Sequence, residues 1–517
     1  MKIRSETNNS LSGYVFIIAF LNILLHLVFY NTLGFHRDEL LYFSLGQHLA
    51  AGYASVPPMV GFVSWVMIHL LGYSLLSARL IPILLSGVYV ILGASVAKEL
   101  GGKKYAQILV SIALMVTPFN LRAFLLFQPV GFGIIFWGLI IWVILKWLNT
   151  NDDKYLLLLG LVAGLGMLNK YLIALEIFGF LLAFALSNKR IVFTKKAFYI
   201  CLLISFVVFL PNFIWQIKEH LPVMEHMQAL ENSQLVHVNR FSFFTDQFFL
   251  ASMAAVLAIP GIISLLVSKK LKLYRPLLIG SIIVVLILAL LRGKSYYTIG
   301  LFILWIAAGG VWWESRLKKQ GSRILLAAVI ILLTLPVVPM GIPVFRAKKL
   351  VKYFAVAMDK FGMDASLRWE DGRIHDLPQD YADMLGWREL AAITAKAYNE
   401  IPDKQGAMIY AENYGEAGSV MVIGKKYHLP DPSCFNGSFF YWFPRHPKHQ
   451  ITSFIYINSE LGKDVASLFG ECREIGKISN PLAREYGTGV WLCTQPRVDF
   501  NKFWEQRVSE IKNPFSH

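Results

Sequence analysis

The sequence predicts a polytopic α-helical membrane protein with about eleven transmembrane helices and a C-terminal extracytoplasmic α/β domain. Hydrophobic residues make up 56% of its 517 residues and the mean hydropathy is +0.52, whereas about 45–50% of a soluble domain is apolar. Lys and Arg gather in alternate short loops, and the composition becomes that of a soluble domain from about Phe345. The excess of apolar residues therefore belongs in lipid.

Eleven hydrophobic runs are long enough, or nearly so, to cross a bilayer, which takes about 20 helical residues. They lie at about 13–33, 74–97, 105–120, 129–148, 155–169, 171–188, 197–215, 247–267, 275–292, 296–314 and 322–340. Asn169 and Lys170 interrupt the stretch from 155 to 188, which predicts either two short helices or one bent helix. The first run is expected to be retained, because it is too long for the core of a signal peptide and no small-residue cleavage site follows it.

Every second loop is basic, beginning with Lys2 and Arg4. Because basic loops tend to stay in the cytoplasm, the N-terminus is predicted to be cytoplasmic and the intervening loops to lie on the outer face of a bacterial inner (plasma) membrane. The formal net charge of +16 is attributed to this topology. No basic stripe interleaved with aromatic residues stands outside these loops, so nucleic acid is not a predicted partner.

Two domains are predicted. Residues 1–344 form the transmembrane domain, whose first outer loop, 34–73, contains juxtamembrane helices, and residues 345–517 form the soluble extracytoplasmic domain. In the outer loop, Met59 to Leu71 is apolar but short for a span, so we expect it to lie along the membrane interface.

Helix and strand patterns alternate in the soluble domain, which predicts a small α/β sandwich. The patterns indicate an amphipathic helix at Asp383 to Asn399 and strands at Ala407 to Tyr410, Ser419 to Ile423, Ile451 to Ile457 and Gly489 to Cys493. Cys472 and Cys493 either form a disulfide, if the domain faces an oxidising compartment, or stay buried thiols, and the sequence leaves both open. Cys434 is expected to stay unpaired.

The strongest candidate for an active site is the sequence His36-Arg37-Asp38-Glu39, directly after the first span. A carboxylate at the depth of a lipid headgroup can accept a proton from an attacking hydroxyl or amine as a general base. Asp38 and Glu39 are therefore the catalytic candidates, and His36 and Tyr42 are further candidates for the same cavity. The alternative is that the acidic pair only caps a helix, because Asp is a good N-cap residue.

Cations at a similar expected depth are candidates for binding a lipid phosphate. They are Arg37, Lys170 and Lys294, with Tyr296 and Tyr297 as hydrogen-bond donors. The alternative for such side chains is that they anchor helix ends at the interface. Three further charged residues lie in or near the spans: Arg122 stays a candidate for the cavity, whereas Arg79 and Glu176 are expected to have structural roles, as in an internal ion pair.

The other large outer loop, from Trp215 to Gln247, carries His220, His226 and His237. Their spacing matches no metal-ligand pattern, so solvated loop histidines are favoured over a metal site. No Gly-rich phosphate loop and no CxxC pair is present. No cofactor is predicted, although the sequence leaves open a divalent cation beside Glu39.

In their order along the chain, these features resemble the bacterial members of glycosyltransferase family 39. This group is related to the protein O-mannosyltransferases and to the lipid A aminoarabinose transferase, and shares the membrane fold called GT-C. The resemblance runs over nearly the whole chain. Besides the acidic pair, it rests on Tyr42, Pro57-Pro58, Gly164-Leu165-Gly166-Met167-Leu168-Asn169-Lys170-Tyr171, Gly293-Lys294-Ser295-Tyr296-Tyr297, Tyr381-Ala382-Asp383-Met384-Leu385-Gly386-Trp387 and Asn413-Tyr414-Gly415-Glu416-Ala417-Gly418.

The resemblance implies transfer of a sugar from a polyprenyl-phosphate donor to a lipid, glycan or protein acceptor on the outer side, with inversion at the anomeric carbon. Asp38 would take the place of the essential first-loop Asp of the family, and the cations would stabilise the departing lipid phosphate. Aminoarabinose transferases carry an Arg and a Lys where this chain has Leu41 and Val56. The phosphate site is therefore expected to differ from theirs.

Two other functions compete with this one. A transporter or a flippase for lipid-linked sugars would also have many spans and buried charges, but it should show paired half-repeats and broken helices near the middle of the membrane. A binding module on a membrane anchor would not need eleven spans. The sequence therefore favours the transferase.

Overall fold

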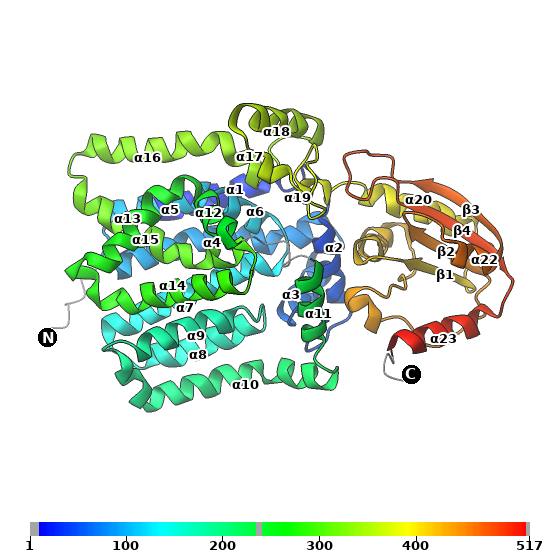
Figure 1. Cartoon of the computed structure of the whole chain (residues 1–517), viewed down its shortest axis with the longest axis horizontal. Helices are drawn as coiled ribbons and strands as arrows, with labels where there is room; N and C mark the ends of the chain where they lie inside the picture. Colours follow the sequence, from blue (N-terminus) through cyan, green and yellow to red (C-terminus); the bar gives the residue numbers. More distant parts are fainter. Residues whose placement is uncertain (1–9, 234–239, 513–517) are drawn as a thin grey trace. The chain divides into compact units, whose positions relative to one another are not determined.

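The computed structural model describes residues 10–233 and 240–512 (Figure 1). His237 lies outside the described residues. The chain forms two compact units. Unit 1 comprises Met1–Tyr30, Ala50–Met59 and Arg79–Val344, whereas unit 2 comprises Asn31–Leu49, Val60–Ala78 and Phe345–His517. Unit 2 therefore combines two pieces of the first outer loop with the C-terminal part of the chain.

All eleven hydrophobic runs fold as helices. Within the described residues, seven helical segments are long and apolar enough to span: Leu75–Glu99 (α4), Pro129–Thr150 (α7), Lys196–Lys218 (α10), Arg240–Val267 (α12 and α13), Lys269–Leu290 (η5 and α14), Ser295–Arg316 (η6 and α15) and Gln320–Gly341 (α16, η7 and α17). An eighth is a pair bent by 66°, α5 (Lys104–Val116) and α6 (Pro118–Leu125). Three shorter apolar helices complete the eleven: α1 (Gly13–Phe29), α8 (Lys154–Met167) and α9 (Ile173–Ala185).

The interruption at Asn169 and Lys170 separates two helices, α8 and α9, as one of the two alternatives predicted. The amide nitrogen of buried Asn169 donates a hydrogen bond of 3.0 Å to the carbonyl of Pro129, the first residue of α7. This contact ties the turn between α8 and α9 to the start of α7. The carbonyl of Leu168 in that turn accepts the backbone N–H of Met59 at 3.0 Å, so a backbone group freed by the break is satisfied, as a break in an apolar environment requires.

Small residues bring the helices of unit 1 into close contact. Gly261 on α13 and Gly309 on α15 face each other's backbones, and a Cβ on Gly309 would lie 1.8 Å from the carbonyl oxygen of Leu257. Helices in lipid gain little from the hydrophobic effect and associate through such close backbone packing.

Unit 2 is built on a four-stranded sheet in the order β1-β2-β4-β3. β1 and β2 are parallel, and the other neighbouring pairs are antiparallel. The strands are β1 (Ala407–Ala411), β2 (Ser453–Asn458), β3 (Phe469–Lys477) and β4 (Gly489–Pro496). The helices are α2 (Arg37–Ser44), α3 (Met59–Leu71), α18 (Ala347–Phe361), α19 (Gln379–Ala382), α20 (Trp387–Glu400), α21 (Tyr414–Gly418), α22 (Lys463–Ser467) and α23 (Phe500–Lys512).

The two faces of the sheet are covered by different helices. On one face, Ile393 of α20 packs against Gly476 of β3. On the other face, Phe500 and Trp504 of α23 form an aromatic core with Tyr410 of β1. Side chains of the neighbouring strands that point to the same face as Tyr410 belong to this core too. This is the α/β arrangement that the sequence predicts, with helices on both faces.

Three details of the soluble domain differ from the prediction. Ser419–Ile423 is a short π-helix, not a strand, because the helix α21, capped by Asn413, runs directly into it. β3, Phe469–Lys477, was not predicted, because it is an outer strand with exposed charged residues and lacks a buried apolar run. The amphipathic helix begins at Trp387, after Gly386 at a φ of 90°.

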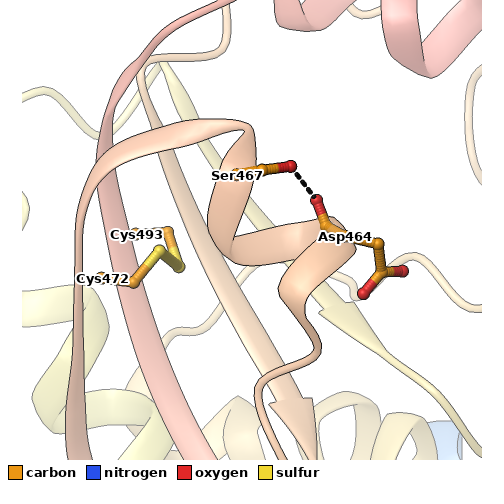
Figure 2. The surroundings of a disulfide bond; sticks show 4 residues. All are labelled: Asp464, Ser467, Cys472 and Cys493. Atoms are coloured by element: carbon orange, nitrogen blue, oxygen red, sulfur yellow. Dashed lines mark hydrogen bonds between the residues drawn. A yellow bond between two sulfur atoms is a disulfide. The ribbon is translucent and has the colours of Figure 1, made fainter.

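The disulfide left open by the sequence is present. Cys472 on β3 and Cys493 on β4 are directly paired across the antiparallel ladder and are joined by a disulfide (Figure 2). Beside it, the turn of α22 is closed by a hydrogen bond of 2.9 Å from the Ser467 hydroxyl to the Asp464 carbonyl. Cys434 is buried and free. The bond ties the outermost strand, β3, to its neighbour β4 inside the sheet.

Candidate functional site

The acidic motif after the first span begins helix α2. His36 is the N-cap residue: its Nδ1 accepts a hydrogen bond of 3.0 Å from the backbone N–H of Asp38. Glu39 closes the capping box, because its carboxylate accepts the N–H of His36 at 2.8 Å. The helix cap that the sequence analysis kept as the alternative is therefore present, and it is formed by His36 and Glu39. The side chain of Asp38 takes no part in it.

The two carboxylates of the motif lie in different surroundings. Glu39 is 0% exposed and uses its carboxylate in the capping box, whereas Asp38 is half-buried. Tyr42, also half-buried, follows Asp38 by one turn and lies on the same face of α2. A reacting group can therefore approach Asp38 more readily than Glu39.

Tyr414 of α21 contacts both charged side chains at the start of α2. Its hydroxyl donates a hydrogen bond of 2.9 Å to Oδ1 of Asp38, and the guanidinium of Arg37 lies 4.6 Å from the centre of its ring. Arg37 also lies 3.8 Å from the carboxylate of Glu485 and donates its backbone N–H to the carbonyl of Asp383. One aromatic side chain thus holds two neighbouring members of the motif.

His36 is buried among carboxylates. Its Nε2 lies 3.5 Å from Asp380 and 3.9 Å from Asp383. Burial disfavours the charged ring, but the hydrogen bond to Asp380 and the charges of Asp38 and Asp383 outweigh it and raise the pKa of His36. Nδ1 can cap α2 only while it carries no proton, so the ring's proton belongs on Nε2, toward Asp380.

Both C-terminal motifs singled out in the sequence pack on the acidic motif. The first motif, residues 381–387, contains Asp383, whose carbonyl accepts the N–H of Arg37. The second motif, residues 413–418, contains α21 and the residue that caps it. A Cβ on Gly415 would lie 2.7 Å from Cγ of Arg37, and one on Gly418 would lie 2.8 Å from Cβ of Leu40. These glycines therefore let α21 approach α2 closely enough for Tyr414 to reach Asp38.

Replacing Gly418 with Val is expected to destabilise unit 2 by about 1–3 kcal/mol, because the new side chain would meet the backbone of Leu40 and not a flexible chain end. Thermal unfolding of the purified protein measures the effect. Gly321→Val is the control, since nothing lies within 4 Å of a Cβ at Gly321. An unchanged unfolding midpoint for Gly418→Val would contradict the close contact.

Unit 1 holds a second group of the predicted residues. Nζ of Lys170, in the turn between α8 and α9, lies 4.8 Å from the ring centre of Tyr297 and 5.8 Å from that of Tyr296. The two tyrosine rings meet edge to face at 4.9 Å, and Phe119 of α6 stacks on Tyr296 at 5.8 Å. Lys170, Tyr296 and Tyr297, predicted separately, therefore form one cluster.

Lys294 belongs to the same cluster through a residue that the sequence analysis set aside. Burial, then the positive charges of Lys170 and of Lys294, lower the pKa of His226 on α11 (Pro222–Ser233). The positive charges of both lysines therefore act on this ring, which stays neutral at pH 7, and Lys294 precedes Tyr296 by two residues. The signal that could have found His226 was its predicted position, since its loop is predicted to lie on the same side of the membrane as Lys170.

Hydrogen bonds to α12 hold the turn that presents Lys294. The Ser295 hydroxyl donates to Asp246, and Thr298 donates to Gln247. Gln247 in turn donates to the carbonyl of Ser295 at 3.2 Å. The tyrosines that follow are therefore fixed by contacts from a neighbouring helix.

The remaining charged candidates have local contacts. Arg122 donates to Gln128 at 3.3 Å and follows Phe119, which stacks on Tyr296, by one turn of α6. Arg79 is fully buried and donates to the carbonyl of Tyr30, just past the end of α1, which is a structural contact. The ion pair expected for Glu176 is not found, since neither carboxylate oxygen has a hydrogen-bond partner in the described chain.

Within residues 10–233 and 240–512, no three His, Cys, Asp or Glu side chains are grouped so that they could hold a metal ion. Glu39, beside which the sequence left a cation open, spends one carboxylate oxygen on the helix cap. The described residues thus offer the acidic motif and the lysine–tyrosine cluster as the places for chemistry.

Comparisons with known proteins agree with this picture. Residues 55–215 match the family model described as dolichyl-phosphate-mannose-protein mannosyltransferase. The structure is similar to ArnT from Cupriavidus metallidurans bound to undecaprenyl phosphate, with a TM-score of 0.60 and 13% identity over 93% of this chain and 98% of that one. The apo state of the same protein gives 0.55 and 14% over the same shares. A search of curated protein sequences gives no match.

At this level of identity the likeness establishes the fold. It confirms the predicted fold class, a multi-pass membrane protein of the GT-C type with a C-terminal α/β domain. The family match covers the stretch that contains Pro57-Pro58 and Asn169-Lys170, two of the motifs on which the resemblance was based. It reaches neither the acidic motif nor Lys294, whose roles depend on the contacts described above.

Proposed function

We propose that this protein, which has the fold of ArnT, transfers a sugar from a polyprenyl-phosphate donor to a lipid, glycan or protein acceptor at the outer face of the bacterial inner membrane. The observation that carries the proposal is the lysine–tyrosine cluster of Lys170, Lys294, Tyr296 and Tyr297 in a fold whose solved relative binds undecaprenyl phosphate. Fold alone does not determine function, but this cluster has the charge and hydrogen-bond donors that a phosphate requires.

In the proposed reaction, Asp38 removes the proton of the acceptor hydroxyl or amine as the new bond to the anomeric carbon forms. The bond from that carbon to the phosphate oxygen breaks, and the lipid phosphate departs. Lys170 and Lys294 offset the negative charge that the leaving phosphate gains, with Tyr296 and Tyr297 as donors. A single displacement inverts the anomeric carbon. Arg37 stays a candidate for the same phosphate.

A deletion strain provides the first test. Mass spectrometry of its envelope glycolipids, polysaccharides and proteins is expected to show the loss of one sugar-bearing species, and the wild-type gene should restore it. An unchanged profile would contradict the proposal.

A second step separates a transferase from a flippase, since loss of either could remove the same product. Donor lipid and acceptor are extracted from the deletion strain and mixed with the purified protein in detergent, where no membrane divides two compartments. A transferase forms product under these conditions, whereas a flippase does not. Absence of product with the wild-type protein would overturn the proposed activity.

A further inference from the structure

Tyr414, which the C-terminal domain contributes, donates a hydrogen bond from its side chain directly to the proposed base. We infer that Tyr414 is a positioning residue for Asp38, so that the C-terminal domain takes part in catalysis by holding the base in its working orientation. This inference rests on the proposed function. It also gives the soluble domain a role in the reaction, which the sequence did not.

The contact is specific to the end of the side chain. The Tyr414 hydroxyl donates to Oδ1 of Asp38 at 2.9 Å, from a position 376 residues later in the chain. Burial, then the negative charge of Asp38, raise the pKa of Tyr414 well above its ordinary value. The phenol therefore keeps its proton at every physiological pH and acts as a donor, not as a second base.

The backbone beneath Tyr414 is fixed by its own capping box. Oδ1 of Asn413 accepts the N–H groups of Gly415 and Glu416 at 2.9 and 3.1 Å. The Glu416 carboxylate accepts the N–H groups of Glu412 and Asn413 at 3.1 and 3.2 Å. A side chain that must hold another within a fraction of an ångström needs this kind of rigid support.

The ring has a second task that can be separated from the first. It lies under the guanidinium of Arg37 at 4.6 Å, and a phenylalanine ring would keep that contact. Tyr414→Phe therefore removes the hydrogen bond to Asp38 and leaves the packing and the cation–ring contact in place.

The hydrogen bond to Asp38 has a direct consequence for the reaction. It fixes the carboxylate so that its other oxygen can meet the acceptor's proton. The groups that surround Asp38 include His36 and Arg37 at the start of its own helix, Asp383 after α19 and Tyr414 on α21. The Phe variant changes the last of these and leaves the other three.

The experiment measures kcat and the KM for the donor for Tyr414→Phe, with donor lipid and acceptor extracted from the deletion strain. We expect kcat to fall about tenfold while the KM for the donor stays within about twofold, because positioning of the base acts on the chemical step and not on donor binding.

Tyr456→Phe is the matched control. It removes a tyrosine-to-carboxylate hydrogen bond of 2.8 Å, to Glu412, in the same domain. Both variants should lose similar thermal stability, but only Tyr414→Phe should lower kcat while the KM for the donor is kept. Wild-type kcat for Tyr414→Phe, or the same fall in kcat for both variants, would overturn the inference. Product formation by the wild-type protein in the same assay keeps that outcome separate from failure of the proposed function.

Discussion

Replacing Asp38 with Asn is expected to abolish sugar transfer, lowering kcat by about a thousandfold, within the range of 10²–10⁴ typical for loss of a general base. Asn has the shape of Asp, and its Oδ1 can still accept the hydroxyl of Tyr414, which lies 2.9 Å away in the native protein. The amide cannot take a proton from the acceptor. Because the contact is kept, the loss should be seen in kcat, with little change in thermal stability.

Two variants make the result specific to this carboxylate. Asp376→Asn is a control for the substitution itself, since Asp376 is an exposed residue of the same unit. Glu39→Gln compares the second catalytic candidate: Gln can serve in a capping box as Glu does, so its loss of kcat should be much smaller. Full activity of Asp38→Asn would contradict the assignment, and equal losses for both would show that Glu39 takes part in the chemistry.

The membrane part of the fold could be predicted well because lipid imposes a long, simple pattern. A span needs about 20 apolar residues with every backbone group satisfied internally, so each hydrophobic run marks a helix, and Asn169 marks the break between two of them. The hydrophobic runs do not show which residue each polar interruption forms a hydrogen bond with. The hydrogen bond from Asn169 to Pro129 joins residues 40 apart, and no local pattern predicts it.

The soluble domain was harder because its local signals conflict. Ser419–Ile423 has the β-branched residues of a strand, but the cap at Asn413 starts a helix that continues through it. The disulfide between Cys472 and Cys493 stayed open because the sequence does not establish that the domain faces an oxidising compartment. The register of β3 and β4 places the two residues directly opposite each other, where a disulfide can form.

The candidate site shows the same limit. The motif His36-Arg37-Asp38-Glu39 could be singled out from its place after the first span. The separate roles of its residues could not be predicted. Glu39 closes a cap and Asp38 faces Tyr414, a residue of a motif that had been noted only as a signature of the soluble domain. Long-range pairs of this kind depend on the folded chain, and here they link the two motifs that the sequence analysis had left unconnected.

Removing the charges of the lysine–tyrosine cluster is the second change with a large expected effect. Lys170→Met keeps a long apolar stem against the rings of Tyr296 and Tyr297 and removes only the ammonium group. With Lys294→Ala in the same chain, kcat/KM for the donor should fall about a hundredfold or more, because preorganised cations at a leaving phosphate are worth about that much. The KM for the acceptor should change by less than about threefold.

The single variants and an independent readout test whether the two lysines act on one group. If both bind the same phosphate, the double variant should lose less than the product of the single losses. Lys318→Ala, an exposed lysine of a predicted cytoplasmic loop, controls for the loss of a positive charge. Without any substrate, Lys170→Met should raise the pKa of His226 measured by NMR titration, since the charge of Lys170 lowers it in the native protein. An unchanged His226 pKa would contradict the cluster, whereas equal effects on donor and acceptor would contradict its role as a phosphate site.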